Sequence, residues 1–144
     1  NVRHNSILKK TASRICSTQV LYGASFVESE IELLIKSYVD NYLPSFLIEL
    51  GIKKIDIDLF NSITKGVYKN ISSIDNIISK HLSEKWSFNR LSETEKSVLR
   101  LATYELRYDK KFKKIIIINE YISIIESFGG NPNFANGILE NISK

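Results

Sequence analysis

The stretch from residue 91 to residue 106, LSETEKSVLRLATYEL, is typical of the start and body of an amphipathic α-helix. Ser92 and Glu95 have the spacing of a capping box, in which each side chain binds the backbone N–H of the other residue. Apolar residues then recur at three- and four-residue steps, as on one buried face of a helix: Val98, Leu99, Ala102 and Leu106. The stretch therefore predicts a helix over about residues 93–108.

The same helical period extends outward from this stretch in both directions. Helices are expected over about 6–25, about 28–42, from Asp56 through Ile71, from Ser72 or Ser73 through Leu82, about 114–128 and 131–143. Residues 44–51 are expected to be irregular or a short helix. We therefore expect an all-α fold, a compact bundle of about seven short-looped helices. It forms a single domain over 1–144, with an N-terminal helical half at about 1–82 and a C-terminal half at about 83–144.

Composition excludes several classes of protein. With 43% hydrophobic and 25% charged residues, the chain is expected to be one ordinary globular domain. The longest purely apolar run is Ile115–Ile118, far short of the roughly 18 residues that a membrane helix needs, so we expect a cytoplasmic protein. Because the sequence contains no methionine, a few N-terminal residues are expected to be missing or removed. One cysteine and two histidines can form neither an intrachain disulfide nor a four-ligand zinc site.

Positive charge is concentrated in two segments of a chain whose net charge is +4. Residues 1–27 contain no acid and four basic residues, namely Arg3, Lys9, Lys10 and Arg14. Residues 107–114 contain five basic residues and a single acid, Asp109. Lys9, Lys10 and Arg14 are expected to lie mostly off the apolar stripe of the first helix, which includes Ala12, Cys16, Gln19 and Tyr22. Either segment could contact an anionic partner, or both could be ordinary solvated faces.

The sequence gives little support to a catalytic function. It contains neither the glycine-rich phosphate-binding motifs nor H-E-x-x-H or C-x-x-C. Cys16 lies on the apolar stripe of the first helix and is expected to be a buried packing residue. The acidic pairs Glu93 with Glu95, and Glu120 with Glu126, are explained by helix caps or solvated faces. A binding function is therefore favoured over an enzyme.

Several short motifs occur along the chain in a fixed order. They are KTASRICSTQVLY at 10–22, LSETEKSVLRLATYEL at 91–106, INE at 118–120, FG at 128–129 and FANGILE at 134–140. This series resembles the NusB family of transcription antitermination factors, in which a basic first helix ends in a Q-A-L-Y-like turn. The family continues with L-R-x-A-x-Y-E-L, I-N-E, F-G and F-V-N-G-V-L-D. Gly66, Val67, Ile74, Asp75 and Trp86 fit the pattern upstream of residue 91.

The resemblance implies a non-enzymatic RNA-binding factor without cofactors. Family members pair with the ribosomal protein NusE, bind a boxA-type single-stranded RNA and act in the RNA polymerase antitermination complex that supports ribosomal RNA transcription. Two alternatives stay open. A NusB-like domain also forms part of certain ribosomal RNA cytosine methyltransferases, although this chain ends directly after its last helix. The other alternative is a purely protein-binding helical module with incidental basic charge.

The resemblance also suggests site residues. Lys10 and Arg14 fall on arginine positions of the family, and together with Lys9 they predict an RNA-binding helix face. Phe134 falls on a phenylalanine that the family places near RNA, although a role as a core anchor is favoured. Glu95 falls on an acidic position of the partner interface, a role that its place in the capping box equally explains.

Other family positions are interpreted as structural. Arg100 is expected to pair with Glu105, and Gly137 to allow a close helix contact. The loop at 130–133 lacks the charged residues that the family tends to have there.

Overall fold

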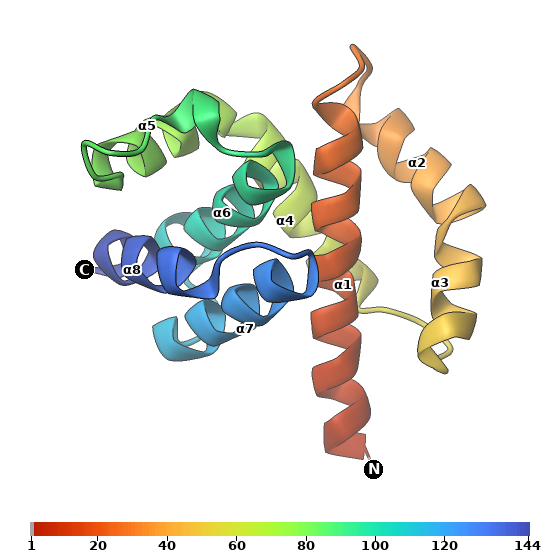
Figure 1. Ribbon diagram of the computed structural model, residues 1–144. Helices are drawn as coiled ribbons and strands as arrows, with labels where there is room; N and C mark the ends of the chain where they lie inside the picture. The colour runs from red at the N-terminus through yellow and green to blue at the C-terminus, as the bar shows by residue number, and fades with distance from the viewer. Residues whose placement is uncertain (1) are drawn as a thin grey trace. The chain divides into compact units, whose positions relative to one another are not determined.

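The structure is a computed structural model that describes the backbone of residues 2–144 and the side chains of residues 8–144 (Figure 1). These residues form eight α-helices and no strand, which confirms the all-α prediction. The chain divides into two compact units, one ending at Tyr68 and one running from Lys69 to Lys144. This boundary lies earlier in the chain than the division expected near residue 82. The side chains of Arg3 and His4 lie outside the described residues.

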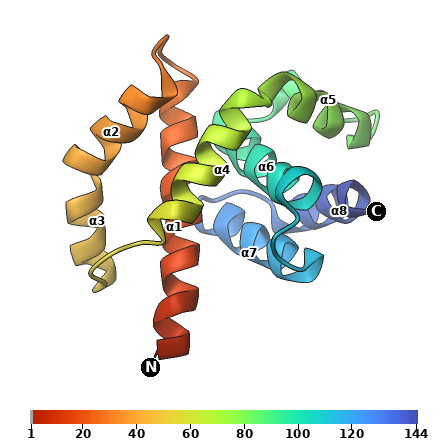
Figure 2. The same cartoon turned by 180° about the vertical axis from the view of Figure 1, so that it is seen from behind.

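The first unit consists of α1 (Val2–Ala24), α2 (Ile31–Asn41), α3 (Leu43–Leu50) and most of α4 (Ile57–Lys69). After α1 the chain reverses, so that α2 and α3 run back alongside it (Figure 1). Seen from behind, α4 crosses the same helix (Figure 2). The core of this unit combines apolar residues of α1, α2 and the start of α3 with the segment that leads into α4 and the start of that helix, namely Ala12, Cys16, Val20, Ile31, Ile35, Tyr38, Leu43, Ile55 and Phe60.

Hydroxyl groups hold α1 close to α4. Ser13 Oγ donates a hydrogen bond of 2.9 Å to the carbonyl oxygen of Asp56, and Thr64 Oγ1 donates one of 2.7 Å to Ser17 Oγ. Ser13, Ser17 and Thr64 are all buried. Buried hydroxyl groups need hydrogen-bond partners, and these residues find theirs across the two elements. Their small side chains also let α1 approach α4 where large apolar side chains would keep the two apart. The middle of α1 is consequently buried on more than one face.

The segment after α2 is more regular than expected. Residues 43–50 form the complete helix α3, with Pro44 in its first turn. The helix ends at Gly51, whose φ of 69° is the left-handed conformation that glycine adopts without strain. This additional helix explains why eight helices occur where about seven were predicted.

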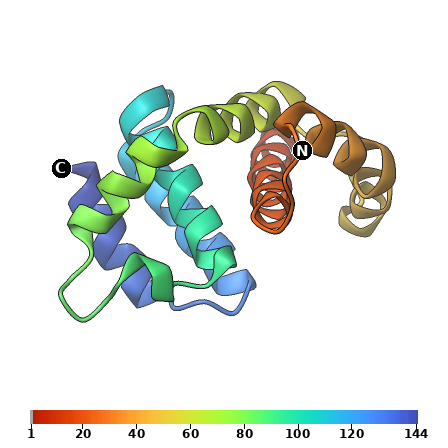
Figure 3. The ribbon, with the colours of Figure 1, turned by 90° about the horizontal axis from the view of Figure 1, so that it is seen from above.

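The second unit consists of α5 (Ile71–His81), α6 (Glu93–Tyr104), α7 (Lys114–Ser127) and α8 (Pro132–Ser143). A short 3-10 turn, η1 (Phe88–Arg90), precedes α6, and a π turn, η2 (Glu105–Asp109), extends it. The view from above shows α5 to α8 gathered around α6 (Figure 3). Its side chains Val98, Leu99, Leu101 and Ala102 are fully buried.

Local capping signals define the helix ends in this unit. Ser92 Oγ accepts the N–H of Glu95 and Glu95 Oε1 accepts the N–H of Ser92, which confirms the predicted capping box. Asn131 Oδ1 accepts the N–H groups of Asn133 and Phe134, so α8 begins as predicted. The predicted start of α5 at Ser72 or Ser73 was wrong, because the helix starts at Ile71 and contains Ser72 within its first turn.

Candidate nucleic-acid interface

Lys9 and Lys10 lie side by side in sequence on α1, and both side chains are partly exposed. Lys10 is not unopposed, since its Nζ lies 3.7 Å from Oδ2 of Asp56. Along the sequence the nearest acid is Glu28. Asp56 is distant along the chain, and only the fold brings it to α1. Of the two lysines, Lys10 is thus the one whose charge an acid of the same unit partly offsets.

Arg14 does not lie on an exposed basic face. Arg14 is 2% exposed, and its neighbours Ser13, Cys16 and Ser17 are buried as well. The prediction of an exposed Arg14 is wrong because α1 is enclosed on more than the one face that its apolar stripe indicated. A buried guanidinium cannot reach a phosphate chain on the surface, so we leave Arg14 out of the candidate interface.

The C-terminal end of α1 is less buried than the predicted apolar stripe implies. Gln19 and Tyr22 are exposed, although both were assigned to the buried face. Tyr22 is 44% exposed and packs edge-on against Phe26, with ring centroids 5.0 Å apart. Gln19 accepts a hydrogen bond from the hydroxyl of Tyr38 and lines a hollow of about 480 Å³ beside α2. Tyr22 is thus an aromatic side chain available to solvent.

Phe134 lies in the first turn of α8 and is half-buried. Its ring contacts that of Trp86, with centroids 4.9 Å apart and an interplanar angle of 44°. Trp86 itself is 47% exposed. Phe134 therefore belongs to a partly exposed aromatic pair. Trp86 fits the family pattern in the sequence, but nothing in the sequence indicated that it would meet Phe134.

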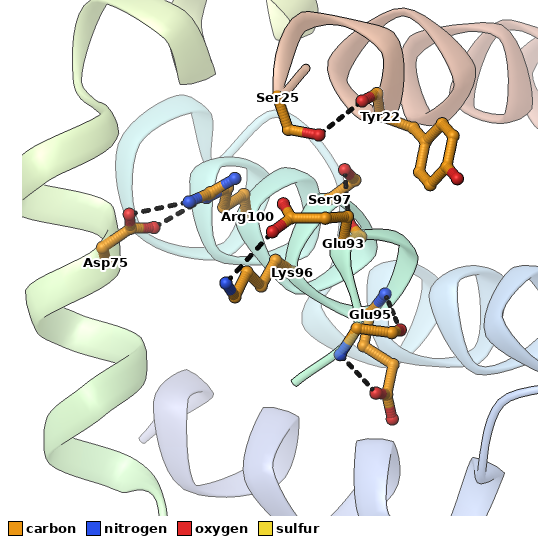
Figure 4. Close-up of polar contacts among 9 residues, drawn as sticks. Tyr22, Ser25, Asp75, Glu93, Glu95, Lys96, Ser97 and Arg100 are labelled. Carbon is orange, nitrogen blue, oxygen red and sulfur yellow. Dashed lines mark hydrogen bonds and ion pairs between the residues drawn. The ribbon is translucent and has the colours of Figure 1, made fainter. Parts of the chain in front are cut away.

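Glu95 is partly exposed at the N-terminal end of α6 (Figure 4). One of its carboxylate oxygens accepts the N–H of Ser92 at 2.9 Å. The residue also lines a hollow of about 530 Å³ together with Phe128, Gly129 and Asn131 from the end of α7 and the start of α8. The capping role is confirmed, and the side chain borders a concave surface that a partner can reach.

The structural pairs differ from those expected. Arg100 forms a bidentate salt bridge with Asp75 of α5. Its Nε donates to Oδ1 at 2.8 Å and its Nη2 donates to Oδ2 at 2.9 Å (Figure 4). Glu105 is buried and accepts a hydrogen bond from the Tyr121 hydroxyl. The predicted Arg100 to Glu105 pair is therefore wrong. So is the close contact at Gly137, where an added Cβ would meet nothing within 4 Å.

The second basic segment connects η2 to α7. Lys110 adopts a left-handed φ of 52° at the end of η2, and Lys114 Nζ donates to the carbonyl oxygen of Ser143. Lys111 lies over the ring of Phe112, with Nζ 5.9 Å from the centroid. Lys110 and Lys111 are exposed, so they offer a matched comparison for the lysines of α1.

Cys16 is fully buried, as predicted. Burial raises the pKa of its thiol to about 11 by penalising the thiolate, an effect that a hydrogen bond with Tyr38 partly offsets. Burial likewise raises the pKa of Tyr38. Within the described residues no group of acids, histidines and cysteines could hold a metal ion. No helix among them is long and apolar enough to cross a membrane.

These observations define an all-α protein that offers partly exposed lysines and aromatic rings as binding groups. The NusB family model matches residues 11–144. The chain belongs to the NusB family.

Two similar proteins carry the description transcription antitermination protein NusB. The one from Clostridium botulinum is 32% identical over 139 residues, which cover 95% of this chain and 99% of that protein. The one from Fervidobacterium nodosum is 47% identical over 87 residues, which cover 59% of this chain and only 61% of that protein.

Solved structures agree with the fold. Thermotoga maritima NusB superposes with a TM-score of 0.76 at 31% identity, over 92% of this chain and 89% of that one. A chain in a crystal structure of the antitermination factors NusB and NusE in complex with dsRNA gives a TM-score of 0.73 at 24% identity. That match covers 92% of this chain and 94% of the other.

Proposed function

We propose that this chain is a non-enzymatic transcription antitermination factor. It binds boxA-type single-stranded RNA together with the ribosomal protein NusE and supports ribosomal RNA transcription in the cytoplasm, within the RNA polymerase antitermination complex. The observation that carries this proposal is its similarity, over 95% of its length, to a relative described as a transcription antitermination protein.

The surface supports a contact with RNA. Lys9 and Lys10 supply positive charge on α1, and Tyr22 supplies an exposed aromatic ring on the same helix. Single-stranded RNA is bound by such combinations of phosphate contacts and stacking. Phe134 offers a second ring, on the other unit. Glu95 is proposed as a contact to NusE, because it is partly exposed beside a hollow.

Fluorescence anisotropy with labelled boxA RNA tests this function. The chain and NusE together are expected to bind more tightly than either alone, because two basic surfaces on one strand release more counterions. A scrambled strand and a boxA duplex serve as controls, the duplex because one solved complex contains dsRNA. If the combined proteins bind boxA no better than the scrambled strand, the proposal is wrong.

A further inference from the structure

A hollow of about 210 Å³ lies beside the aromatic pair in the second unit. It is bordered by the end of α5, the loop that follows it and α8 from its first turn to Asn141 in its last. Since one water occupies about 30 Å³ of liquid, the hollow has room for a small planar ring. Its walls include Trp86 and Phe134, together with the polar side chains His81, Asn133 and Asn141.

The loop before η1 places Trp86 at this hollow. The backbone N–H of Trp86 donates to the carbonyl oxygen of Ser83 at 2.9 Å, which closes a turn. Phe134 supports the indole ring, with the centroids 4.9 Å apart, while 47% of Trp86 remains exposed. An aromatic ring that is backed on one side and open to solvent provides a surface for stacking.

The polar residues supply hydrogen bonds without a fixed charge. Asn133 and Asn141 each carry both a donor and an acceptor in the amide group. His81 Nδ1 lies 2.7 Å from the carbonyl oxygen of Ile77, so in the neutral ring Nδ1 donates and Nε2 is left as an acceptor. Among the described residues that line the hollow there is no carboxylate, lysine or arginine. A neutral, planar, hydrogen-bonding ligand fits this chemistry better than a phosphate or a charged peptide.

We propose that this hollow binds one unpaired nucleobase of the RNA, stacked on Trp86 and hydrogen-bonded by Asn133 or Asn141. This inference rests on the proposed function. The site would recognise a base, whereas Lys9 and Lys10 would contact phosphates. The two kinds of contact therefore respond differently to salt, since only charge neutralisation releases counterions.

Trp86 is the only tryptophan of the chain, so its fluorescence reports on the hollow without a label. Titration of the chain and NusE with boxA RNA is expected to quench this signal, and Trp86→Phe provides the blank. Trp86→Ala is expected to weaken RNA affinity about tenfold, within the range for losing one stacked base. The slope of log affinity against log salt should stay unchanged, because no charge is removed.

Tyr108→Ala is the matched control variant. Tyr108 is 39% exposed in the same unit and stacks on Tyr104, outside the hollow. This variant is expected to leave both RNA affinity and the quenching unchanged.

A second measurement begins with the wild-type chain. Abasic nucleotides placed in turn along the RNA are expected to abolish the quenching of the wild-type chain at one position. With that RNA, Trp86→Ala should cost no further affinity. If RNA binds tightly but no abasic position affects Trp86, the base site is wrong and the proposed function stands. If the wild-type chain with NusE binds no boxA RNA, both proposals fall.

Discussion

Lys10 and Asp56 form an ion pair within the first unit, with Nζ of the lysine 3.7 Å from Oδ2 of the aspartate. Asp56 also caps α4, since its Oδ1 accepts the N–H of Leu59 at 3.1 Å. One carboxylate thus stabilises a helix start and offsets charge on the face of α1 that we propose for RNA.

Asp56→Asn separates these two roles. Asparagine keeps the capping acceptor, so the free energy of unfolding is expected to change by less than about 0.5 kcal/mol. Without the opposing charge, Lys10 can neutralise one more phosphate. The slope of log affinity against log salt should therefore steepen by about 0.7, as anisotropy titrations over a salt series will measure.

Asp58→Asn is the control for that experiment. Asp58 is an exposed acid in the first turn of α4, so its replacement makes the same change of net charge close by. An equal effect of the two variants would mean that overall charge, and not the pair with Lys10, governs affinity.

Lys9 allows a direct test of the basic face. Lys9→Ala is expected to reduce the salt slope by about 0.7, the value for one lost contact to single-stranded nucleic acid. Lys111→Ala removes the same charge from the second basic segment and should change the slope less. Should the two variants behave alike in the same titrations, the assignment of the interface to α1 is wrong.

The contact between Arg100 and Asp75 is expected to stabilise the second unit. The two side chains are only 12% and 25% exposed, and two parallel hydrogen bonds join them. Asp75→Ala leaves a largely buried guanidinium without this partner and is expected to cost about 2 kcal/mol. Arg100→Lys keeps the charge but loses the fork geometry and should cost about 1 kcal/mol. Urea denaturation measures both.

The exposed pair of Lys36 and Asp40 provides the comparison. Its side chains are 75% and 55% exposed although the atoms are 2.9 Å apart. Lys36→Ala is therefore expected to cost no more than about 0.5 kcal/mol. If Asp75→Ala proves equally mild, the contact at Arg100 contributes geometry and little stability.

Burial of Cys16 makes stability depend on alkaline pH. The pKa of its thiol rises from 9.0 to about 11 on folding, so the folded chain holds this proton more tightly than the unfolded chain. The contribution is complete below pH 9 and is lost as the pH rises toward 11. The free energy of unfolding should fall by up to about 2 to 3 kcal/mol over that interval.

Cys16→Ala isolates this effect. In urea denaturation between pH 8.5 and 10, the free energy of unfolding is expected to decline less steeply for the variant, because the variant lacks the thiol. Some decline should remain, since other groups titrate in both proteins. Native Cys16 should also react slowly with thiol reagents and quickly in denaturant. Rapid labelling of the native chain would contradict the burial of the thiol.

The sequence predicted what depends on near neighbours in the chain. The capping box at Ser92 and the asparagine cap at Asn131 act within one turn, so their residue types suffice to locate them. Burial of Arg14 and the partner of Arg100 depend on contacts between helices far apart in sequence. A single apolar stripe indicates one buried face, and it cannot show that small hydroxyl residues bury a second face of α1.

For the candidate site, too, the sequence predicted some features and others depend on the fold. Lys9 and Lys10 were found by counting charges, yet their difference arises from Asp56, 46 positions from Lys10 in the numbering. Trp86 stands in a loop with no periodicity, so its contact with Phe134 follows only from the fold. Local patterns thus suggest the residue types of the proposed interface, and the packing decides which of them are exposed.

Glu95 combines a cap with a proposed contact to NusE, and two substitutions separate these roles. Glutamine also forms capping boxes, so Glu95→Gln is expected to keep the free energy of unfolding within about 0.5 kcal/mol while removing the charge. Glu95→Ala loses both and should cost about 1 kcal/mol. If the carboxylate contacts NusE, both variants weaken the complex similarly in calorimetric titrations at matched folded fraction. Binding by Glu95→Gln that equals the wild type would leave Glu95 with the capping role alone.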